Sequence, residues 1–181
     1  MTVAAIVLAA GAGSRFGGAK QATLLPYVLR RVRAASEVDE IVVVLGAHEV
    51  AVKGARVVHA TDWGLGPGAS LRAGLGALEP SVEAAVICLA DGPLLAPAAI
   101  NRIVEAWRHG AGGVIAASYA GRRGHPVCLD RRVWGQVPNE GARMLEPVLV
   151  ACDDLGEPGD VDTVEDLSEL EKALTEDTSD D

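Results

Sequence analysis

Short apolar runs that alternate with helical patterns extend along almost the whole chain. Each run is bounded by turn residues and is typical of a buried strand. The runs cover residues 4–9, 41–45, 57–59, 85–89, 113–117 and 148–151. The helical patterns cover residues 24–36, 69–78, 97–107, a short stretch at 141–145, and 163–174. This alternation predicts a three-layer α/β/α fold in which right-handed crossovers build a mostly parallel sheet.

The size of the chain favours one domain. With 181 residues and 49% hydrophobic content, it can form one full core but is short for two. Aromatic residues make up only 3%, so the core must come from Ala, Val and Leu, which suits buried parallel strands. We expect the domain to cover residues 1–174. The last seven residues, TEDTSDD at 175–181, predict an acidic, disordered tail.

Charge and hydropathy exclude several classes of partner. A net charge of -9 argues against general binding to nucleic acid or to anionic membranes. No apolar run is long enough to span a bilayer, and the N-terminus lacks the pattern of a signal peptide. The three cysteines, Cys88, Cys128 and Cys152, have no metal-binding or redox spacing and predict reduced thiols. We therefore expect a cytoplasmic protein.

A glycine-rich turn with two cations follows the first predicted strand. Gly11, Gly13, Gly17 and Gly18 would let backbone N–H groups approach an anion, and Arg15 and Lys20 add positive charge. This combination suits the phosphates of a nucleoside triphosphate. The turn is neither a Walker A loop nor the dinucleotide fingerprint G-x-G-x-x-G, since Phe16 stands at the third glycine of the latter. The alternative is a plain strand-to-helix turn.

Four segments in sequence order resemble the MobA-like nucleotidyltransferases, the family that includes molybdenum cofactor cytidylyltransferase. The first is L-A-A-G-x-G-S-R-F-G-G-x-K at residues 8–20. DWGLGPGASLRAGL at 62–75 is similar to a second nucleotide loop, and ICLADGPLLAPAAI at 87–100 to a metal-binding strand end. GRRGHPVCL at 121–129, NEGARML at 139–145 and GDVDTVEDL at 159–167 complete the pattern. The resemblance implies the Rossmann-like sheet of the nucleotidyltransferase type.

The resemblance also implies a nucleotide site. The strand-and-turn residues would bind the nucleotide, the loop at 66–70 would recognise its base, and Arg15 and Lys20 would be catalytic, stabilising the departing pyrophosphate. Ser70 could instead cap a helix, and Arg72 would reach either phosphate or solvent. The expected nucleotide-binding residues are Leu8, Ala9, Ala10, Gly11, Gly13, Gly66, Gly68 and Ser70.

Two carboxylates are candidate ligands for Mg²⁺. Asp91 follows the apolar run AAVICLA and precedes Gly92, which places it at the carboxyl end of a predicted central strand, where α/β sheets bind ligands. Mg²⁺ commonly takes one or two protein carboxylates and completes its shell with phosphate oxygens and water. Asp162 is the position that resembles the family's second metal-binding residue. A turn role for Asp91 and a helix-cap role for Asp162 are the alternatives.

The acceptor side is expected near residues 121–129. Arg122, Arg123 and His125 lie in a segment that the resemblance places beside a phosphorylated acceptor, and the glycines at 121 and 124 predict a loop. An ordinary solvent-exposed loop is the alternative. The other histidines, among them His48, have no ligand-like spacing and receive no role.

The chain departs from the family pattern after Lys20. The family continues with a leucine-rich segment and a G-x-P turn, whereas this chain has QATLLPYVLRR, with Pro26 where a longer loop would enter the helix. VAVKGARVV is similarly abbreviated. Either the loops are truncated or a segment is missing from the sequence, and truncation would impair acceptor binding.

Together these features predict a Mg²⁺-dependent nucleotidyltransferase. It would transfer a nucleoside monophosphate from a nucleoside triphosphate to a phosphorylated small-molecule acceptor and release pyrophosphate. Ala10 resembles the cytidylyltransferase branch, so CTP with a molybdopterin-type acceptor is the leading expectation. The alternatives are a guanylyl- or sugar-phosphate nucleotidyltransferase and an inactive nucleotide-binding paralogue.

Overall fold

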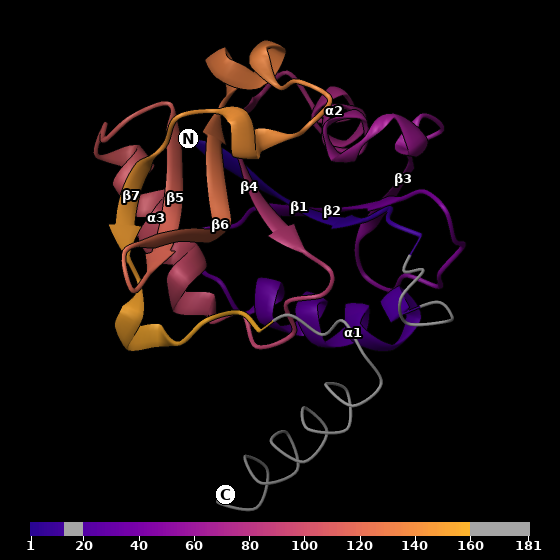
Figure 1. The fold of residues 1–181 in the computed structure, drawn as a ribbon, viewed down its shortest axis with the longest axis horizontal. Helices are drawn as coiled ribbons and strands as arrows, with labels where there is room; N and C mark the ends of the chain where they lie inside the picture. The colour runs from indigo at the N-terminus through magenta and orange to yellow at the C-terminus, as the bar shows by residue number, and fades with distance from the viewer. Residues whose placement is uncertain (13–19, 160–181) are drawn as a thin grey trace, which may run out of the picture.

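A seven-stranded sheet forms the centre of the molecule (Figure 1). The computed structural model describes residues 1–12 and 20–159; the expected helix at 163–174 and the tail lie outside this part. The sheet has the order β3-β2-β1-β4-β6-β5-β7. Its strands are β1 (Thr2–Ala9), β2 (Glu40–Leu45), β3 (Arg56–His59), β4 (Val82–Leu89), β5 (Val114–Tyr119), β6 (Arg122–Asp130) and β7 (Val148–Ala151). The predicted three-layer, mostly parallel α/β domain is thereby confirmed.

Strand β6 alone runs against the direction of the other described strands. It pairs antiparallel with both β4 and β5, while β7 is parallel to β5. The sequence predicted a loop at 121–124, and this was wrong. Ala120 and Gly121 form a tight turn with φ of +50° and +72°, the backbone twist that suits a two-residue β-hairpin. The residues that follow continue directly into β6.

Helices cover both faces of the sheet. On one face lie α1 (Lys20–Arg33) and α3 (Pro97–Arg108), and on the other lies α2 (Pro67–Gly76) (Figure 1). The alternate residues of β1 separate the two cores: Ala5 and Val7 pack with the α1 and α3 side, whereas Ala4 and Ile6 pack with α2. Both faces of a central strand are therefore buried, which explains why its sequence is a continuous apolar run.

The first helix begins earlier than predicted. α1 starts at Lys20 rather than near Leu24, and Pro26 lies inside it. Residues 20–26 are therefore helical, where the family pattern would place an intervening loop. The short helix expected at 141–145 is a single 3₁₀ turn, Ala142–Met144, whereas Pro97 occupies the first turn of α3 as predicted.

Two further features of the described residues concern the cysteines and the helices. Cys88, Cys128 and Cys152 are all buried free thiols. Among residues 1–12 and 20–159, no helix combines the length and apolar character needed to cross a bilayer.

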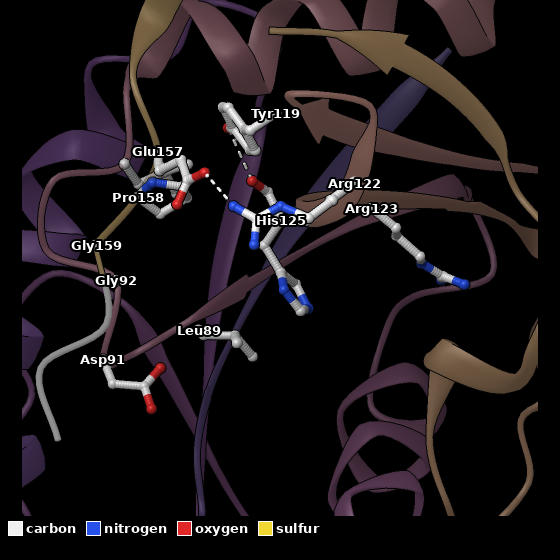
Figure 2. A pocket seen from close by; sticks show the side chains of 12 residues that line it. Leu89, Asp91, Gly92, Tyr119, Arg122, Arg123, His125, Glu157, Pro158 and Gly159 are labelled. Carbon is white, nitrogen blue, oxygen red and sulfur yellow. Dashed lines mark hydrogen bonds and ion pairs between the residues drawn. The ribbon is translucent and has the colours of Figure 1, made fainter. Parts of the chain in front are cut away.

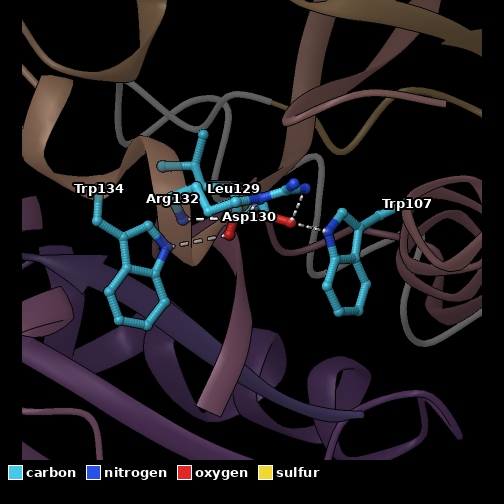
Figure 3. Close-up of polar contacts among 5 residues, drawn as sticks. All are labelled: Trp107, Leu129, Asp130, Arg132 and Trp134. Carbon is cyan, nitrogen blue, oxygen red and sulfur yellow. Dashed lines mark hydrogen bonds and ion pairs between the residues drawn. The ribbon is translucent and has the colours of Figure 1, made fainter. Parts of the chain in front are cut away.

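A buried carboxylate ties β6 to α3 (Figure 3). Asp130 Oδ2 accepts a hydrogen bond from Trp107 Nε1 at 2.9 Å, and Oδ1 accepts from the backbone N and the Nε of Arg132 at 2.9 and 2.8 Å. Asp130 also caps the 3₁₀ helix Arg131–Gln136, whose Trp134 Nε1 donates to Leu129 O at 3.0 Å. Hydrogen bonds from Arg132 and Trp107 lower the pKa of Asp130 to about 2 against the opposing effect of burial.

We predict that Asp130→Asn destabilises the fold by on the order of 2 kcal/mol at neutral pH, because the ionised carboxylate matches its donors better than an amide does. A carboxyl group with a lowered folded-state pKa stabilises above its unfolded-state pKa, so this contribution is lost as the pH falls from 3.8 toward about 2. Denaturant unfolding of both proteins across this range measures it. A difference in unfolding free energy that stays constant down to pH 2 would contradict the assignment.

Candidate functional site

The carboxyl ends of β1 and β4 meet at the centre of one sheet edge. The two strands are parallel neighbours, with Leu8 beside Leu89, and Ala90 N donates to Leu8 O at 3.1 Å. The start of the glycine turn, at Ala10 and Gly11, therefore lies next to Asp91. This is the position expected of Asp91 from its place after the apolar run, and it corresponds to the ligand-binding edge of an open α/β sheet.

The loop after β2 supports the start of the glycine turn. Ala47 N donates to Ala10 O at 3.1 Å, and His48 Nε2 donates to Ala12 O at 2.7 Å. A Cβ on Gly46 would lie 2.7 Å from Ala10 O and 2.8 Å from the Cβ of Trp63, so only glycine fits between them. His48 was given no role from the sequence, since its 36-residue separation from Ala12 left no signal of this contact.

The remaining part of the turn falls outside the described residues. This applies to Gly13 and Arg15, and to the side chain of Lys20, whose backbone begins α1. Their roles in binding phosphate stay predictions, as does the metal role of Asp162.

The base-side loop, by which we mean residues 66–70, packs tightly against residues 138–139, and its residues 67–70 form the first turn of α2 and not the expected loop. A Cβ on Gly68 would stand 1.7 Å from Pro138 O, and Gly68 N donates to Asn139 O at 2.9 Å. Gly66 has a φ of +123°, and a Cβ there would be 2.6 Å from Asn139 O. The close approach of another backbone segment is thus sufficient to require both glycines. Whether they also contact a nucleotide stays a prediction.

Two polar side chains of α2 behave differently from expectation. The N-cap of α2 is Gly66 and Pro67 occupies its first turn, so Ser70 does not cap the helix and is instead buried within it. Arg72, which was expected to reach phosphate or solvent, binds residues 137 and 139. Its Nη1 donates to Val137 O at 2.9 Å and its Nη2 to Asn139 Oδ1 at 2.7 Å.

A cavity of about 360 Å³ opens beside Asp91 (Figure 2). Residues from β4, β5, β6 and the segment 157–159 line it, and His125 faces Asp91 across it. The ring of Tyr119 forms part of the wall, its hydroxyl donating to His125 O at 3.0 Å. A Cβ on Gly124 would lie 2.9 Å from that ring, so the glycine admits the aromatic side chain. The cavity therefore combines apolar walls with a few charged groups.

The two arginines predicted to bind the acceptor differ in how they are engaged. Arg122 is 78% exposed and pairs with Glu157 at 3.2 Å. Arg123 donates to the backbone carbonyls of Ala142, Arg143 and Leu145 at 2.9, 3.1 and 2.7 Å, so its guanidinium holds a neighbouring segment. Arg122 is consequently the better placed of the two to exchange its present partner for a ligand anion.

His125 is held in its neutral form. The pKa of His125 is lowered to about 4, chiefly by burial; the charge of Asp91 opposes this shift, and the charge of Arg123 adds to it. At neutral pH its imidazole can therefore donate one hydrogen bond and accept another, but it brings no positive charge to the cavity.

Asp91 supplies a hard oxygen donor of the type that Mg²⁺ prefers. Within residues 1–12 and 20–159, no group of three or more His, Cys, Asp and Glu side chains could enclose a metal ion. One carboxylate at a cavity wall does not make an all-protein metal cage, but it fits an ion that takes most of its ligands from substrate phosphates and water.

The chain is similar to known proteins over most of its length. The sequence profile of the MobA-like NTP transferase domain matches residues 5–153. Nicotine blue oxidoreductase from Paenarthrobacter nicotinovorans is 34% identical over 199 residues, covering 93% of this chain and 96% of the relative. Since this alignment is longer than the 181-residue chain, the relative carries residues that this chain lacks.

Solved structures show the same fold. Rv0371c from Mycobacterium tuberculosis H37Rv superposes with a TM-score of 0.77 at 28% identity, covering 94% of this chain and 97% of its own. The same protein in complex with manganese gives a TM-score of 0.72 at 27% identity, covering 94% and 98%. A nucleotidyl transferase from Methanothermobacter, at 18% identity and a TM-score of 0.71 with 97% and 98% coverage, shares the fold.

We predict that Gly68→Ala destabilises the protein by roughly 1–3 kcal/mol, because the added methyl group must displace the backbone at Pro138. Gly76→Ala is the matched control on the same helix, where a Cβ meets nothing within 4 Å and the loss of backbone freedom in the unfolded chain should be neutral or stabilising. Thermal unfolding of both variants measures the difference. Equal melting temperatures would contradict the packing described for Gly68.

The second prediction for the site concerns the charge of His125. Its imidazole should titrate near pH 4, because burial opposes protonation. A basic group with a lowered folded-state pKa destabilises the fold as the pH falls from 6.5 to about 4, since the unfolded chain takes up the proton first. NMR titration of the ring nitrogens gives the midpoint directly. A midpoint above pH 6 would show that the imidazole is not enclosed.

Proposed function

Because the chain belongs to the MobA-like NTP transferase family, we propose that it transfers a nucleoside monophosphate, with CMP from CTP as the leading case, to a phosphorylated small-molecule acceptor. An acceptor phosphate oxygen would attack the α-phosphorus, a new O–P bond would form, and the bond to the bridging oxygen would break to release pyrophosphate. The attacking oxygen is already anionic, so the reaction depends on positioning and charge stabilisation rather than on a strong general base.

The observation that carries the proposal is the shared edge of β1 and β4. The pairing of Leu8 with Leu89 brings the start of the glycine turn beside Asp91, and the cavity of about 360 Å³ opens from Asp91 toward Arg122 and His125. A triphosphate on the turn and an acceptor in the cavity would thus meet at Asp91. This arrangement supports a two-substrate transfer better than simple nucleotide storage.

On the nucleotide side, the strand end and base-side loop would bind the NTP, as proposed for Leu8, Ala9, Ala10, Gly11, Gly13, Gly66, Gly68 and Ser70. Arg15 and Lys20 would stabilise the charge on the departing pyrophosphate. Asp91 and Asp162 would hold Mg²⁺, which would offset phosphate charge when bound. The manganese in the Rv0371c structure supports the use of a divalent ion by a protein of this kind.

On the acceptor side, Arg122, Arg123 and His125 would have different tasks. Arg122 would exchange Glu157 for an anionic group of the acceptor, because that pair is exposed and an exposed ion pair contributes little stability. Arg123 would keep its place in the cavity lining through its hydrogen bonds to the carbonyls of residues 142, 143 and 145. The neutral imidazole of His125 would donate or accept one hydrogen bond at the cavity wall facing Asp91.

The choice of CTP and a molybdopterin-type acceptor rests on Ala10, which resembles the cytidylyltransferase branch. The contacts of Ala10 with the loop at 46–47 make this position tightly packed, so its side-chain size should matter to the base beside it. A guanylyl- or sugar-phosphate nucleotidyltransferase is the alternative within the same reaction class. An inactive nucleotide-binding paralogue would retain NTP affinity without turnover.

One comparison favours a second candidate function. The relative at 34% identity is an oxidoreductase, so a redox reaction on the same fold is also compatible with this chain. The two functions differ in the nucleotide that must bind. A transferase binds an NTP with a divalent ion, whereas an oxidoreductase needs a redox cofactor such as a nicotinamide or flavin nucleotide.

We predict that Asp91→Ala lowers pyrophosphate release from CTP, Mg²⁺ and a molybdopterin acceptor by about 100-fold or more, because a carboxylate that holds the metal acts directly on the transferred phosphate. Glu83→Gln is the matched control, since Glu83 is an exposed carboxylate at the opposite end of the same strand. Unchanged pyrophosphate release in Asp91→Ala would exclude the proposed metal role.

A further inference from the structure

Two arginines, one from α2 and one from β6, hold the segment 137–145. From α2, Arg72 donates to Val137 O and Asn139 Oδ1. From β6, Arg123 donates to the carbonyls of residues 142, 143 and 145. The segment is therefore fixed at both ends by side chains from two elements that are distant in the sequence. It forms a wall that connects α2 with β6.

The wall determines the shape of the base-side loop. Gly68 N donates to Asn139 O, and the glycines at 66 and 68 leave no space for any displacement of Pro138 or Asn139 toward them. Gly141 N in turn donates to Pro138 O at 3.0 Å, which closes the turn that presents these carbonyls. A shift of residues 137–139 would consequently move the backbone at 66–70 with it.

The Arg72 side chain is suited to this task. Its planar fork spans two acceptors, a backbone carbonyl at 2.9 Å and the Asn139 amide oxygen at 2.7 Å. A lysine offers a single compact charge and would hold one of the two acceptors at a time. Asn139 is exposed, and its side chain makes this contact beside its own backbone carbonyl, which accepts from Gly68 N.

We propose that Arg72, acting through Asn139, is a positioning residue that sets the nucleobase selectivity of the base-side loop. The inference rests on the proposed function, in which this loop lies against the base of an NTP. Arg72 itself does not contact the nucleotide. Selectivity among bases depends on hydrogen-bonding groups held in fixed positions, so loosening the wall should weaken binding of the preferred NTP more than that of the others.

The test is isothermal titration of ATP, CTP, GTP and UTP, each with Mg²⁺, into the full chain and its variants. Arg72→Ala should weaken binding of the best NTP by about tenfold and reduce the ratio between the best and worst NTP. Arg72→Lys and Asn139→Ala should fall between this variant and the wild type. Asn139→Asp, which keeps an acceptor for Arg72, should retain wild-type selectivity.

Arg131→Ala is the matched control for loss of stability. Arg131 also donates to two backbone carbonyls, Glu79 O at 3.0 Å and Val82 O at 2.8 Å, but at the opposite end of β4 from the site. It should lower the melting temperature without changing the ratio of NTP affinities. If Arg72→Ala only lowers the melting temperature in the same way, the positioning role is wrong.

Different results of the NTP titrations would contradict the proposed function and the positioning role of Arg72. A wild-type chain that binds none of the four NTPs would overturn the proposed function, and the inference with it. A wild-type chain that binds one NTP selectively, together with Arg72→Ala and Arg72→Lys variants whose affinities and selectivity stay within twofold of it, would overturn the inference alone.

Discussion

The parallel pairing of β1 with β4 at the centre of the sheet is the constraint on which the rest of the site depends. The chain builds β1, moves outward through β2 and β3, and then returns to add β4 on the other side of β1. Leu8 and Leu89 lie side by side, but the chain after β1 crosses toward β2, whereas the chain after β4 crosses in the opposite direction toward β5. At such a reversal of strand order an open α/β sheet forms a crevice for ligands. The burial of β1 and β4 on both faces makes this edge rigid.

Around that edge, contacts between distant segments set the shape of each half of the site. The loop after β2 supports the glycine turn through Ala47 and His48, and residues 138–139 support the base-side loop. Glu157 pairs with Arg122 in the lining of the cavity (Figure 2). Leu94 N donates to the carbonyl of the adjacent Pro158 at 2.8 Å. Most of these contacts use backbone groups. The shape of the site is thus set mainly by backbone contacts between its loops, and few of these contacts depend on a single side chain.

The sequence was sufficient to predict the parallel strands, because a buried strand leaves a continuous apolar run. It was also sufficient to predict the place of Asp91 at a strand end, because Asp91 directly follows such a run. It was insufficient for β6, since Gly121, Gly124 and Pro126 are typical of loops. In the structure Gly121 serves a hairpin turn, and Gly124 makes room for the Tyr119 ring. Gly66 and Gly68 were interpreted as ligand-binding glycines, although packing against residues some 70 positions away also requires them. Such contacts, like those of Arg72, His48 and Asp130, leave no periodic or local pattern in the sequence.

The proposed site at the carboxyl ends of β1 and β4 should bind a nucleoside triphosphate. Thermal unfolding in the presence of ATP, CTP, GTP or UTP with Mg²⁺, and of NADH or NADPH for comparison, tests it most directly. At least one NTP, with CTP first, should raise the melting temperature by roughly 5 °C at a concentration about 100 times its Kd. No shift with any of the four NTPs, or a shift with the nicotinamide nucleotides alone, would contradict it.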